Sequence, residues 1–349
     1  MDVRLSAEQR ALRDSAAQVV SSLAPRTVRE LDDSERAAKL DATVDVSGWR
    51  ELRTAAVAAG GVPLASAVET AIVAEELGRG LADTPFLGPT LAAELRRLAA
   101  APPGSSLETV AFTPDLSAPA SAADGVLPSP AIAIDARAAP SALVLVPASG
   151  GYRLASAAVP DARATLDLTR SVARLDYPAA VVSLPAQGRP LTAEDLVRWT
   201  SLGLALTCAD LVGAMSGAVH LACEYALTRR QYGVAIGTFQ AVQHRLADAF
   251  VSLEGSRSIA LHAAWAVDAS LAGAALAAAA SAKAYCARAA RTVCEAVIQV
   301  HGGIGNTWEC LAHLYLRRTL FSSDILGGVG ASLARVLDHH GIGPGDGLR

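Results

Sequence analysis

Apolar residues recur every three or four positions through the first hundred residues, and this spacing predicts amphipathic helices. Ser6 and Gln9 have the spacing of a capping box, so a first helix is expected to begin directly after Ser6. Residues 1–104 therefore read as an N-terminal α-helical domain. Further helices are expected over residues 49–59, 68–77 and 87–98.

The pattern changes between residues 105 and 190, where short apolar runs alternate with turn residues. Twelve of the seventeen prolines fall in or just before this stretch, and proline is excluded from helix interiors. No segment of helical length separates the apolar runs, so we expect a small antiparallel sheet or barrel. The expected strands are residues 107–112, 131–134, 142–146 and 179–184.

Helical spacing returns at residue 191, and the predicted helices are now long. They cover residues 202–228, 239–263 and 271–300. A glycine-rich segment stops the last of them, and at least one shorter helix is expected after it. Residues 191–349 therefore read as a helical bundle, and the chain as mostly α with a small β middle domain.

Composition narrows the classes of partner. Apolar residues make up 52% of the chain but aromatic residues only 4%, which suits closely packed, alanine-rich helices. The net charge of −4 gives no electrostatic reason to expect nucleic acid or an anionic membrane surface. The longest apolar run, residues 271–282, is too short to span a bilayer, and no leader-like segment precedes Ser6. We expect a cytoplasmic protein without membrane insertion, whose five cysteines are small core residues.

Two segments carry residues suited to a phosphate-bearing ligand. One begins at Arg229, between two long predicted helices, and the other begins at Gln299, where a helix gives way to glycines. Arginine offers a fixed fork of donors, and glycine lets backbone N–H groups approach an anion closely. Either segment alone would more simply be a helix stop with an interhelical ion pair, so the argument depends on their joint occurrence.

Together with the three-part layout, these segments resemble the acyl-CoA dehydrogenase family over nearly the whole chain. Arg-x-Gln-Tyr-Gly from Arg229, followed by Phe239 and Gln240, matches one family motif. Gln-x-x-Gly-Gly-x-Gly from Gln299 matches another, as do residues 75–79 and 166–170. The resemblance implies an N-terminal helical domain, a β-barrel-like middle domain and a C-terminal four-helix bundle.

In that family both C-terminal motifs reach across a dimer interface to the FAD of the neighbouring subunit. The resemblance therefore implies a set of cofactor-binding residues in this chain. They are Arg229, Gln231 and Tyr232 on the pyrophosphate and ribityl side, Gln299, Gly302 and Gly303 on the adenosine arm, and Ile236, Phe239 and Gln240 along the pocket.

The catalytic base of that family has no counterpart at either expected position. The reaction needs a carboxylate that removes the α-proton of a thioester while hydride leaves the β-carbon for the flavin. The family places this base nine residues after an arginine that closes a short helix, or twenty-six residues before the loop arginine. Counting from Arg317 gives Leu326, and counting back from Arg229 gives Gly203. The nearest acid, Asp324, is the weak candidate for a replacement.

The middle domain is reduced as well. The family stretch that hydrogen-bonds the flavin ring corresponds here only to residues 112–116, and the segment that covers the ring has no counterpart. The chain therefore keeps the half-site that it would donate to a neighbour and lacks the half-site that it would need itself.

This asymmetry predicts a subunit of a heteromeric FAD-dependent acyl-CoA dehydrogenase, with a larger catalytic partner in an α2β2 assembly. The resemblance implies an acyl-CoA substrate that becomes a 2-enoyl-CoA, and an electron-transfer flavoprotein as acceptor. More loosely, the chain resembles the small subunits of actinobacterial enzymes that shorten sterol side chains. Two alternatives remain open: a homomeric enzyme that uses Asp324 as base, and a structural subunit without cofactor.

The remaining polar candidates have simpler structural interpretations. Glu309 is expected to be a first-turn carboxylate of the next helix, and His244 and His262 are expected to be surface or interface residues. His339 and His340 have no partner at metal-ligand spacing, so no metal site is predicted.

Overall fold

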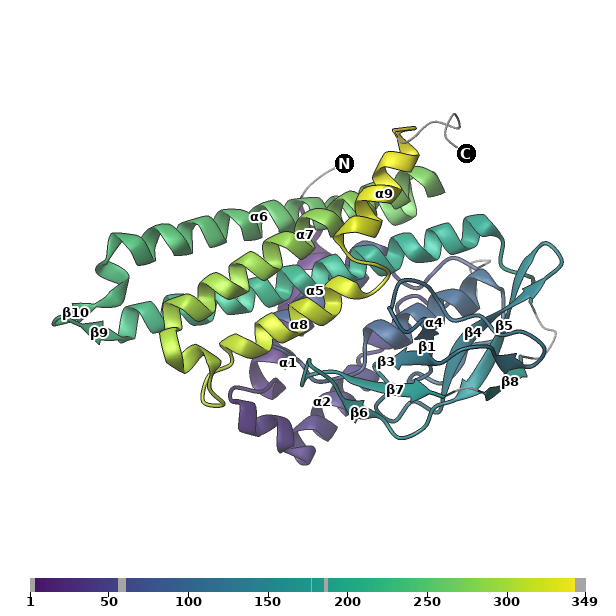
Figure 1. Ribbon diagram of the computed structural model, residues 1–349, viewed down its shortest axis with the longest axis horizontal. Coiled ribbons are helices and arrows are strands. Elements are labelled where there is room, and N and C mark those ends of the chain that lie inside the picture. Colours follow the sequence, from purple (N-terminus) through teal and green to yellow (C-terminus); the bar gives the residue numbers. More distant parts are fainter. Residues whose placement is uncertain (1–3, 56–60, 177, 185–187, 343–349) are drawn as a thin grey trace.

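The computed structural model describes residues 4–55, 61–176, 178–184 and 188–342. Within them, N-terminal helices are followed by a β region and then by a long helical bundle (Figure 1). This order confirms the predicted fold class. The strands run from Thr109 to Ser183, inside the predicted range 105–190.

The N-terminal helices are mostly where the hydrophobic spacing predicts them. The capping box of Ser6 and Gln9 is formed at the start of the first helix. The elements are α1 (Ala7–Leu23), α2 (Ser34–Val46), α3 (Ala67–Arg79) and α4 (Leu87–Leu98), with the short 3-10 helices η1 (Val28–Asp32) and η2 (Trp49–Glu51).

The helix predicted over residues 49–59 is wrong for the described part of that range, where only η2 forms. The backbone N–H groups of Leu64 and Ala65 donate to the carbonyls of Thr54 and Leu52 at 3.0 and 2.9 Å. These carbonyls are therefore paired with a later segment of the chain instead of with the next helical turn. Residues 56–60 lie outside the described residues.

The β region forms one sheet with the order β2-β8-β5-β4-β1-β3-β7-β6. The prediction of an antiparallel sheet is wrong at one pair of strands, because β1 and β4 are parallel. β3 runs antiparallel to β1 on one side, and the chain reverses again before β4 returns on the other side of β1. The strands are β1 (Thr109–Phe112), β2 (Val126–Leu127), β3 (Ala131–Ile134), β4 (Ser141–Ala148), β5 (Gly151–Ala158), β6 (Arg163–Ala164), β7 (Ser171–Leu175) and β8 (Ala179–Ser183).

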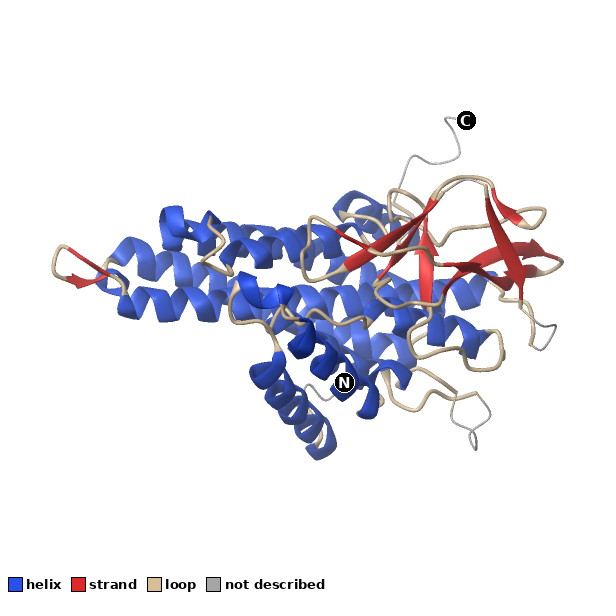
Figure 2. Ribbon diagram, turned by 90° about the horizontal axis from the view of Figure 1, so that it is seen from below, coloured by secondary structure: helices blue, strands red, loops and turns tan. Residues whose placement is uncertain are grey.

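The C-terminal bundle is built around α5 (Ala193–Thr228). This helix packs against α3 and α4 on one side and against the later helices on the other (Figure 1). Figure 2 shows the strands of the β region beside one end of the helical bundle. A β-carbon at Gly213 would lie 2.0 Å from the carbonyl oxygen of Glu75, so only glycine allows α3 and α5 to approach this closely. The other helices are α6 (Gln240–Ala269), α7 (Ala272–His301), α8 (Ala312–Asp324) and α9 (Val329–His339).

By length and hydropathy alone, α5 and the stretch Ala312–His339 would each be able to cross a membrane. The most apolar part of α5 is 94% buried inside the fold, so its place at the centre of the bundle accounts for its composition. The second stretch is interrupted between α8 and α9, where Leu326 and Gly327 have positive φ.

Asp210, in the middle of α5, is the centre of a buried ion network. Arg318 on α8 donates to its Oδ1 from Nε and Nη2 at 3.0 and 2.7 Å, and Ser322 donates to Oδ2 at 2.6 Å. Burial alone would raise the pKa of Asp210, but the charges of Arg318 and Arg170 and these hydrogen bonds lower it to about 2.

Arg170, the last residue of the 166–170 motif, links this ion network to the sheet. Its guanidinium lies 3.1 Å from Asp210 and 3.1 Å from Asp135, whose Oδ2 accepts from the backbone N–H of Gly88 in α4 at 3.0 Å. Asp167 lies 3.5 Å from Arg170 Nε, and burial raises the pKa of its carboxyl. The motif thus holds the N-terminal helices, the sheet and the bundle together.

Candidate functional site

A small β-hairpin joins α5 to α6 and projects from one end of the bundle (Figure 1). Its strands are β9 (Arg230–Gln231) and β10 (Val234–Ala235), and its two turn residues, Tyr232 and Gly233, have φ of +51° and +83°. Two consecutive positive φ values are typical of a type I′ turn, which matches the twist of a hairpin. The sequence motif predicted a loop here without indicating the hairpin.

The hairpin presents the predicted pyrophosphate-side residues to solvent. Arg229, Gln231 and Tyr232 are exposed, with the Tyr232 side chain 94% accessible. Arg229 caps α5 through its backbone N–H, which donates to Tyr225 at 2.8 Å, and its side chain is left free. Among the described residues, no carboxylate pairs with this guanidinium. A phosphate oxygen is the natural partner for such an unpaired fork of donors.

The three residues expected along the pocket have different environments. Ile236 is only 9% exposed and anchors the hairpin to the bundle. Phe239 is partly exposed and meets the ring of Tyr232 edge-on, with ring centroids 6.3 Å apart. Gln240 is the exposed first residue of α6. Phe239 and Gln240 are therefore accessible to a ligand, whereas Ile236 is buried where the hairpin meets the bundle.

The second motif forms a tight exposed turn at the end of α7. Gly302 has φ +66° and donates its N–H to the last carbonyls of α7, and the chain continues as the 3-10 helix η4 (Gly302–Asn306). A β-carbon added at Gly302 or Gly303 would meet no other atom within 4 Å. Gln299 is exposed beside them. The positive φ accounts for Gly302, but packing within the chain gives no reason for glycine at 303, so this position suits an approaching ligand.

A ring contact joins the two motifs. Tyr225, one turn before Arg229, stacks on His301, which lies between Gln299 and Gly302, with centroids 4.5 Å apart. Burial lowers the pKa of His301, so the ring is neutral at pH 7, and its Nδ1 lies 2.8 Å from the carbonyl oxygen of Val297. Beside the stack is an open groove of about 530 Å³. The structure therefore brings together two segments that are seventy residues apart in sequence.

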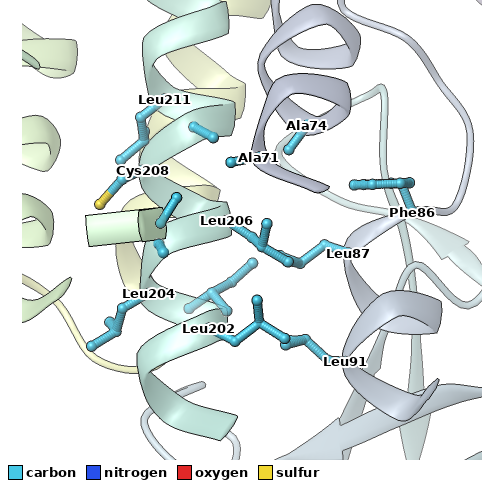
Figure 3. Close-up of a cluster of buried hydrophobic side chains, with 14 of the residues drawn as sticks. Ala71, Ala74, Phe86, Leu87, Leu91, Leu202, Leu204, Leu206, Cys208 and Leu211 are labelled. Atoms are coloured by element: carbon cyan, nitrogen blue, oxygen red, sulfur yellow. The ribbon is translucent and has the colours of Figure 1, made fainter. Parts of the chain in front are cut away.

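The two candidate base positions also converge, at a different place in the bundle. A β-carbon at Gly203 would lie 2.2 Å from Cδ1 of Leu326, so the two positions are in direct contact. Leu326 is 1% exposed and has φ +62°. Leu202 and Leu206, close to Gly203 in the sequence of α5, point toward Leu91 and Leu87 of α4 (Figure 3). A space that would hold a desolvated carboxylate is thus filled by a leucine side chain.

Comparison with known proteins settles the family. Residues 201–338 match the family model described as acyl-CoA dehydrogenase, C-terminal domain. Over 337 residues the chain is 32% identical to the acyl-CoA dehydrogenase IpdE2 of Mycobacterium tuberculosis, which covers 91% of this chain and 93% of that protein. The chain belongs to the acyl-CoA dehydrogenase family. The resemblance inferred from its motifs is confirmed.

Solved structures share the fold of this acyl-CoA dehydrogenase family member over almost its entire length. The ChsE4-ChsE5 complex from Mycobacterium tuberculosis gives a TM-score of 0.79 at 24% identity, covering 99% of this chain and 100% of the other. The Tcur3481-Tcur3483 steroid ACAD gives 0.77 at 23% identity, covering 96% and 98%. PigA with FAD and proline gives 0.75 at 18% identity, covering 98% and 100%.

For an acyl-CoA dehydrogenase, the donors of this chain fit one half of FAD and not the other. The exposed arginine and the open glycine turn suit the diphosphate and adenosine. In the middle domain, residues 113–117 instead form a closed turn, in which Asp115 accepts hydrogen bonds from Thr113 and Ser117 at 2.6 and 2.9 Å. The backbone carbonyl of Leu116 accepts from the N–H of Leu326 at 2.8 Å, so this turn packs directly against the filled base position.

Asp324 does not offer the environment that a base of this enzyme family needs. It is the exposed last residue of α8, two positions from Leu326. The exposed carboxylate is solvated, whereas abstraction of an α-proton requires a desolvated group placed beside the substrate. The geometry therefore counts against the homomeric alternative.

A buried lysine behind the base position was missed by the sequence analysis. Lys283 on α7 is fully buried and donates to Thr207 Oγ1 at 3.0 Å and to the carbonyls of Ser322 and Ile325 at the end of α8. Burial lowers its pKa to about 8. The sequence offers one signal for this residue, because Lys283 is one of only two lysines and stands inside an alanine-rich segment. It fixes the loop that carries Leu326.

The other polar candidates have no catalytic partners in the described residues, and no group of His, Cys, Asp and Glu there is arranged to hold a metal. His244 and His262 are exposed on α6, as expected. Glu309 is exposed but precedes α8, so its prediction as a first-turn residue is wrong. The five cysteines are free thiols: Cys208, Cys286, Cys294 and Cys310 are buried, and Cys223 is half-buried.

Proposed function

We propose that this chain is the non-catalytic subunit of a heteromeric FAD-dependent acyl-CoA dehydrogenase. It donates the adenosine and pyrophosphate half of the FAD site to a larger partner subunit, in an α2β2 assembly. The partner supplies the carboxylate base and the binding site for the flavin ring. The reaction is the α,β-dehydrogenation of an acyl-CoA thioester to a 2-enoyl-CoA, in which FAD, when bound, accepts the hydride.

The observation that carries this proposal is the contrast between two parts of the bundle. At one end, the Arg229 side chain and Gly303 are exposed, and neither has a partner or a packing role among the described residues. In its interior, the base position is closed by Leu326 against Gly203. A subunit with a purely structural role would have no physical reason to keep exposed residues that suit a phosphate. The alternative of a structural subunit without cofactor is therefore disfavoured.

Each retained residue has a defined task in this proposal. Arg229 neutralises a diphosphate oxygen with a charge-assisted hydrogen bond, and Gln231 adds a donor from the same hairpin. The ring of Tyr232 covers the ribityl side. Gln299 and the glycine turn receive the adenosine arm, because the missing β-carbons leave room for it.

The names of the similar proteins support the choice of substrate class and assembly. The ChsE4-ChsE5 structure is a complex, and Tcur3481-Tcur3483 is a steroid ACAD. We therefore propose a steroid side-chain acyl-CoA as the substrate of the complete enzyme. An electron-transfer flavoprotein is the acceptor that we expect from the family.

Counting flavins in the complex tests the proposal. The chain is co-expressed with a larger acyl-CoA dehydrogenase subunit from the same genome, and FAD per complex is measured by absorbance after denaturation. Arg229→Ala should lower FAD occupancy, since a buried charge-assisted contact contributes about 1.5–3 kcal/mol. Arg230→Ala, one residue along the same exposed hairpin, is the matched control and should retain FAD. Unchanged flavin in the Arg229 variant would reject the donated half-site.

A further inference from the structure

Trp308 is the most exposed tryptophan of the chain, and it directly follows the glycine turn. Its side chain is 61% accessible, whereas Trp49 and Trp199 are buried and Trp265 is 36% accessible. A large aromatic side chain in solvent lacks the stabilisation that burial would give, so folding stability does not explain a tryptophan at this position.

The exposed ring is nevertheless held in place. The guanidinium carbon of Arg317 lies 5.8 Å from the ring centroid, within the range of a cation–π contact. The ring of His313 meets Trp308 edge-on, with centroids 5.5 Å apart and planes at 87°. Arg317 is itself fixed by a hydrogen bond to the carbonyl of Leu166 at 3.3 Å. Trp308 is therefore a supported ring with much of its surface open.

The surroundings of the ring are polar. His313 is 7% exposed, and neither of its ring nitrogens has a hydrogen-bond partner among the described residues. Burial and the charge of Arg317 lower its pKa, so it is neutral at pH 7. The charged neighbours are Arg317 and the exposed carboxylate of Glu309. A flat ring held by a guanidinium and a histidine suits a polar heterocycle better than an apolar protein segment.

We infer that Trp308, supported by Arg317 and His313, is a stacking platform for the purine ring of a nucleotide. The inference rests on the proposed function and names the part of FAD that this site receives: the adenine, next to the glycine turn that takes the adenosine arm. A purine face stacks on an aromatic ring, and its edge offers a donor that the carboxylate of Glu309 can accept.

The length of α8 favours the adenine end of FAD over the flavin end. Trp308 precedes this thirteen-residue helix and Leu326 follows it. At 1.5 Å per residue the helix separates the two positions by about 20 Å. A ring bound at Trp308 is thus far from the base position of the same subunit, which is where a flavin ring would have to react.

Tryptophan fluorescence of the apo complex tests this inference without any measurement of turnover. ADP should quench the emission of the parent complex and leave the Trp308→Phe complex unchanged, whereas pyrophosphate, which lacks adenine, should have little effect in either. Trp308→Ala should weaken FAD binding about tenfold, in the range expected for loss of one base stack. Trp308→Phe, which keeps a stacking face, should stay close to the parent, and Trp265→Phe is the control for the loss of a different tryptophan.

Equal quenching by pyrophosphate and ADP would overturn the inference, as would unchanged FAD affinity in Trp308→Ala. The failure of the inference is distinguishable from failure of the proposed function. If Arg229→Ala loses FAD while Trp308→Ala keeps it, only the platform is rejected. If both variants bind FAD like the parent, the donated half-site is rejected as well.

Discussion

Asp210 and Asp324 show how surroundings decide what a carboxylate can do. Asp210 is buried between two arginines and stays ionised with a pKa of about 2. Its lone pairs are already engaged, so it holds helices together and is not free to accept a substrate proton. Asp324 is free but solvated at the end of α8. Neither carboxylate combines burial with availability, the combination that proton abstraction from carbon requires.

We predict that Asp324→Asn changes the turnover of the assembled complex by only a few-fold. A positioned general base contributes about 10²–10⁴-fold, so a loss of that size would identify Asp324 as the base. The measurement is acyl-CoA-dependent reduction of an artificial acceptor by the co-purified complex. Ser323→Ala, beside it on the same helix end, controls for disturbance of the loop.

The pKa shift of Asp210 predicts a dependence of stability on pH. Its pKa in the folded chain, about 2, is below the usual aspartate value of 3.8, so its contribution to stability is fully present above pH 4 and is lost as the pH falls toward 2. This shift corresponds to about 2 kcal/mol. Between pH 5 and pH 2, the free energy of unfolding should fall by about that much more in the parent than in Asp210→Asn, measured by urea titration.

At neutral pH, Asp210→Asn should destabilise the chain by about 3–5 kcal/mol, because it leaves two buried guanidinium groups without their shared partner. Asp167→Asn is the control within the same network. Burial raises the pKa of Asp167, so removing that charge should cost much less. Equal losses in the two variants would contradict the central place given to Asp210.

At the scale of elements, the site depends on how helix ends are brought together. The end of α5, the hairpin and the end of α7 form one exposed surface because Tyr225 stacks on His301. At the C-terminal end of α8, Lys283 donates a hydrogen bond to the carbonyl of Ile325. The side chain of Arg335 donates to the carbonyl of Leu326 at 2.8 Å. The loop carrying the base position is thus fixed from both sides.

We predict that Leu326→Glu does not create an active homomer. The new carboxylate would enter a hydrophobic space without a partner, which costs several kcal/mol, and the closed turn of residues 113–117 still leaves the flavin ring without a seat. The test is anaerobic mixing of the purified variant with FAD and acyl-CoA thioesters, followed by flavin absorbance. Leu326→Gln is the uncharged control. Flavin bleaching by the glutamate variant alone would show that the chain lacks only a base.

Hydrophobic spacing predicted most helices because each one buries a continuous stripe, as in α3 and α4. It failed at residues 49–55, where Leu52 and Thr54 pair with a later segment. It located β1, but the expectation of an antiparallel sheet failed there, because its parallel partner β4 lies about thirty residues away. The motifs located Arg229 and Gln299, but the contact between Tyr225 and His301 and that between Gly203 and Leu326 depend on helix packing. No local pattern encodes such contacts between residues more than seventy positions apart.

At the scale of the whole molecule, the bundle leaves large apolar side chains uncovered along its outer helices. They lie on α6, α7 and α9 and around the hairpin, beside a groove of about 600 Å³. A single chain rarely exposes this much apolar surface unless a partner covers it. The exposed residues include Leu227, Phe250, Val251, Trp265, Tyr285, Leu333 and Leu337.

We predict that the chain expressed alone is colourless and associates with itself or precipitates. Co-expression with the larger subunit should give a discrete yellow complex, because the partner covers the apolar helices and completes the FAD site. Size-exclusion chromatography with light scattering and the absorbance near 450 nm distinguish the two states. A soluble yellow homomer that turns over acyl-CoA would contradict the proposed dependence on a partner.

The contact between Gly203 and Leu326 also bears on the history of this subunit. Each position would bar the other from regaining a base: a side chain at 203 collides with the leucine, and a glutamate at 326 enters a pocket shaped for a leucine. Under the proposed function, a base at position 203 would therefore also need a smaller residue at position 326. Such a chain would depend on its partner for activity, and we expect the genes of the two subunits to be inherited together.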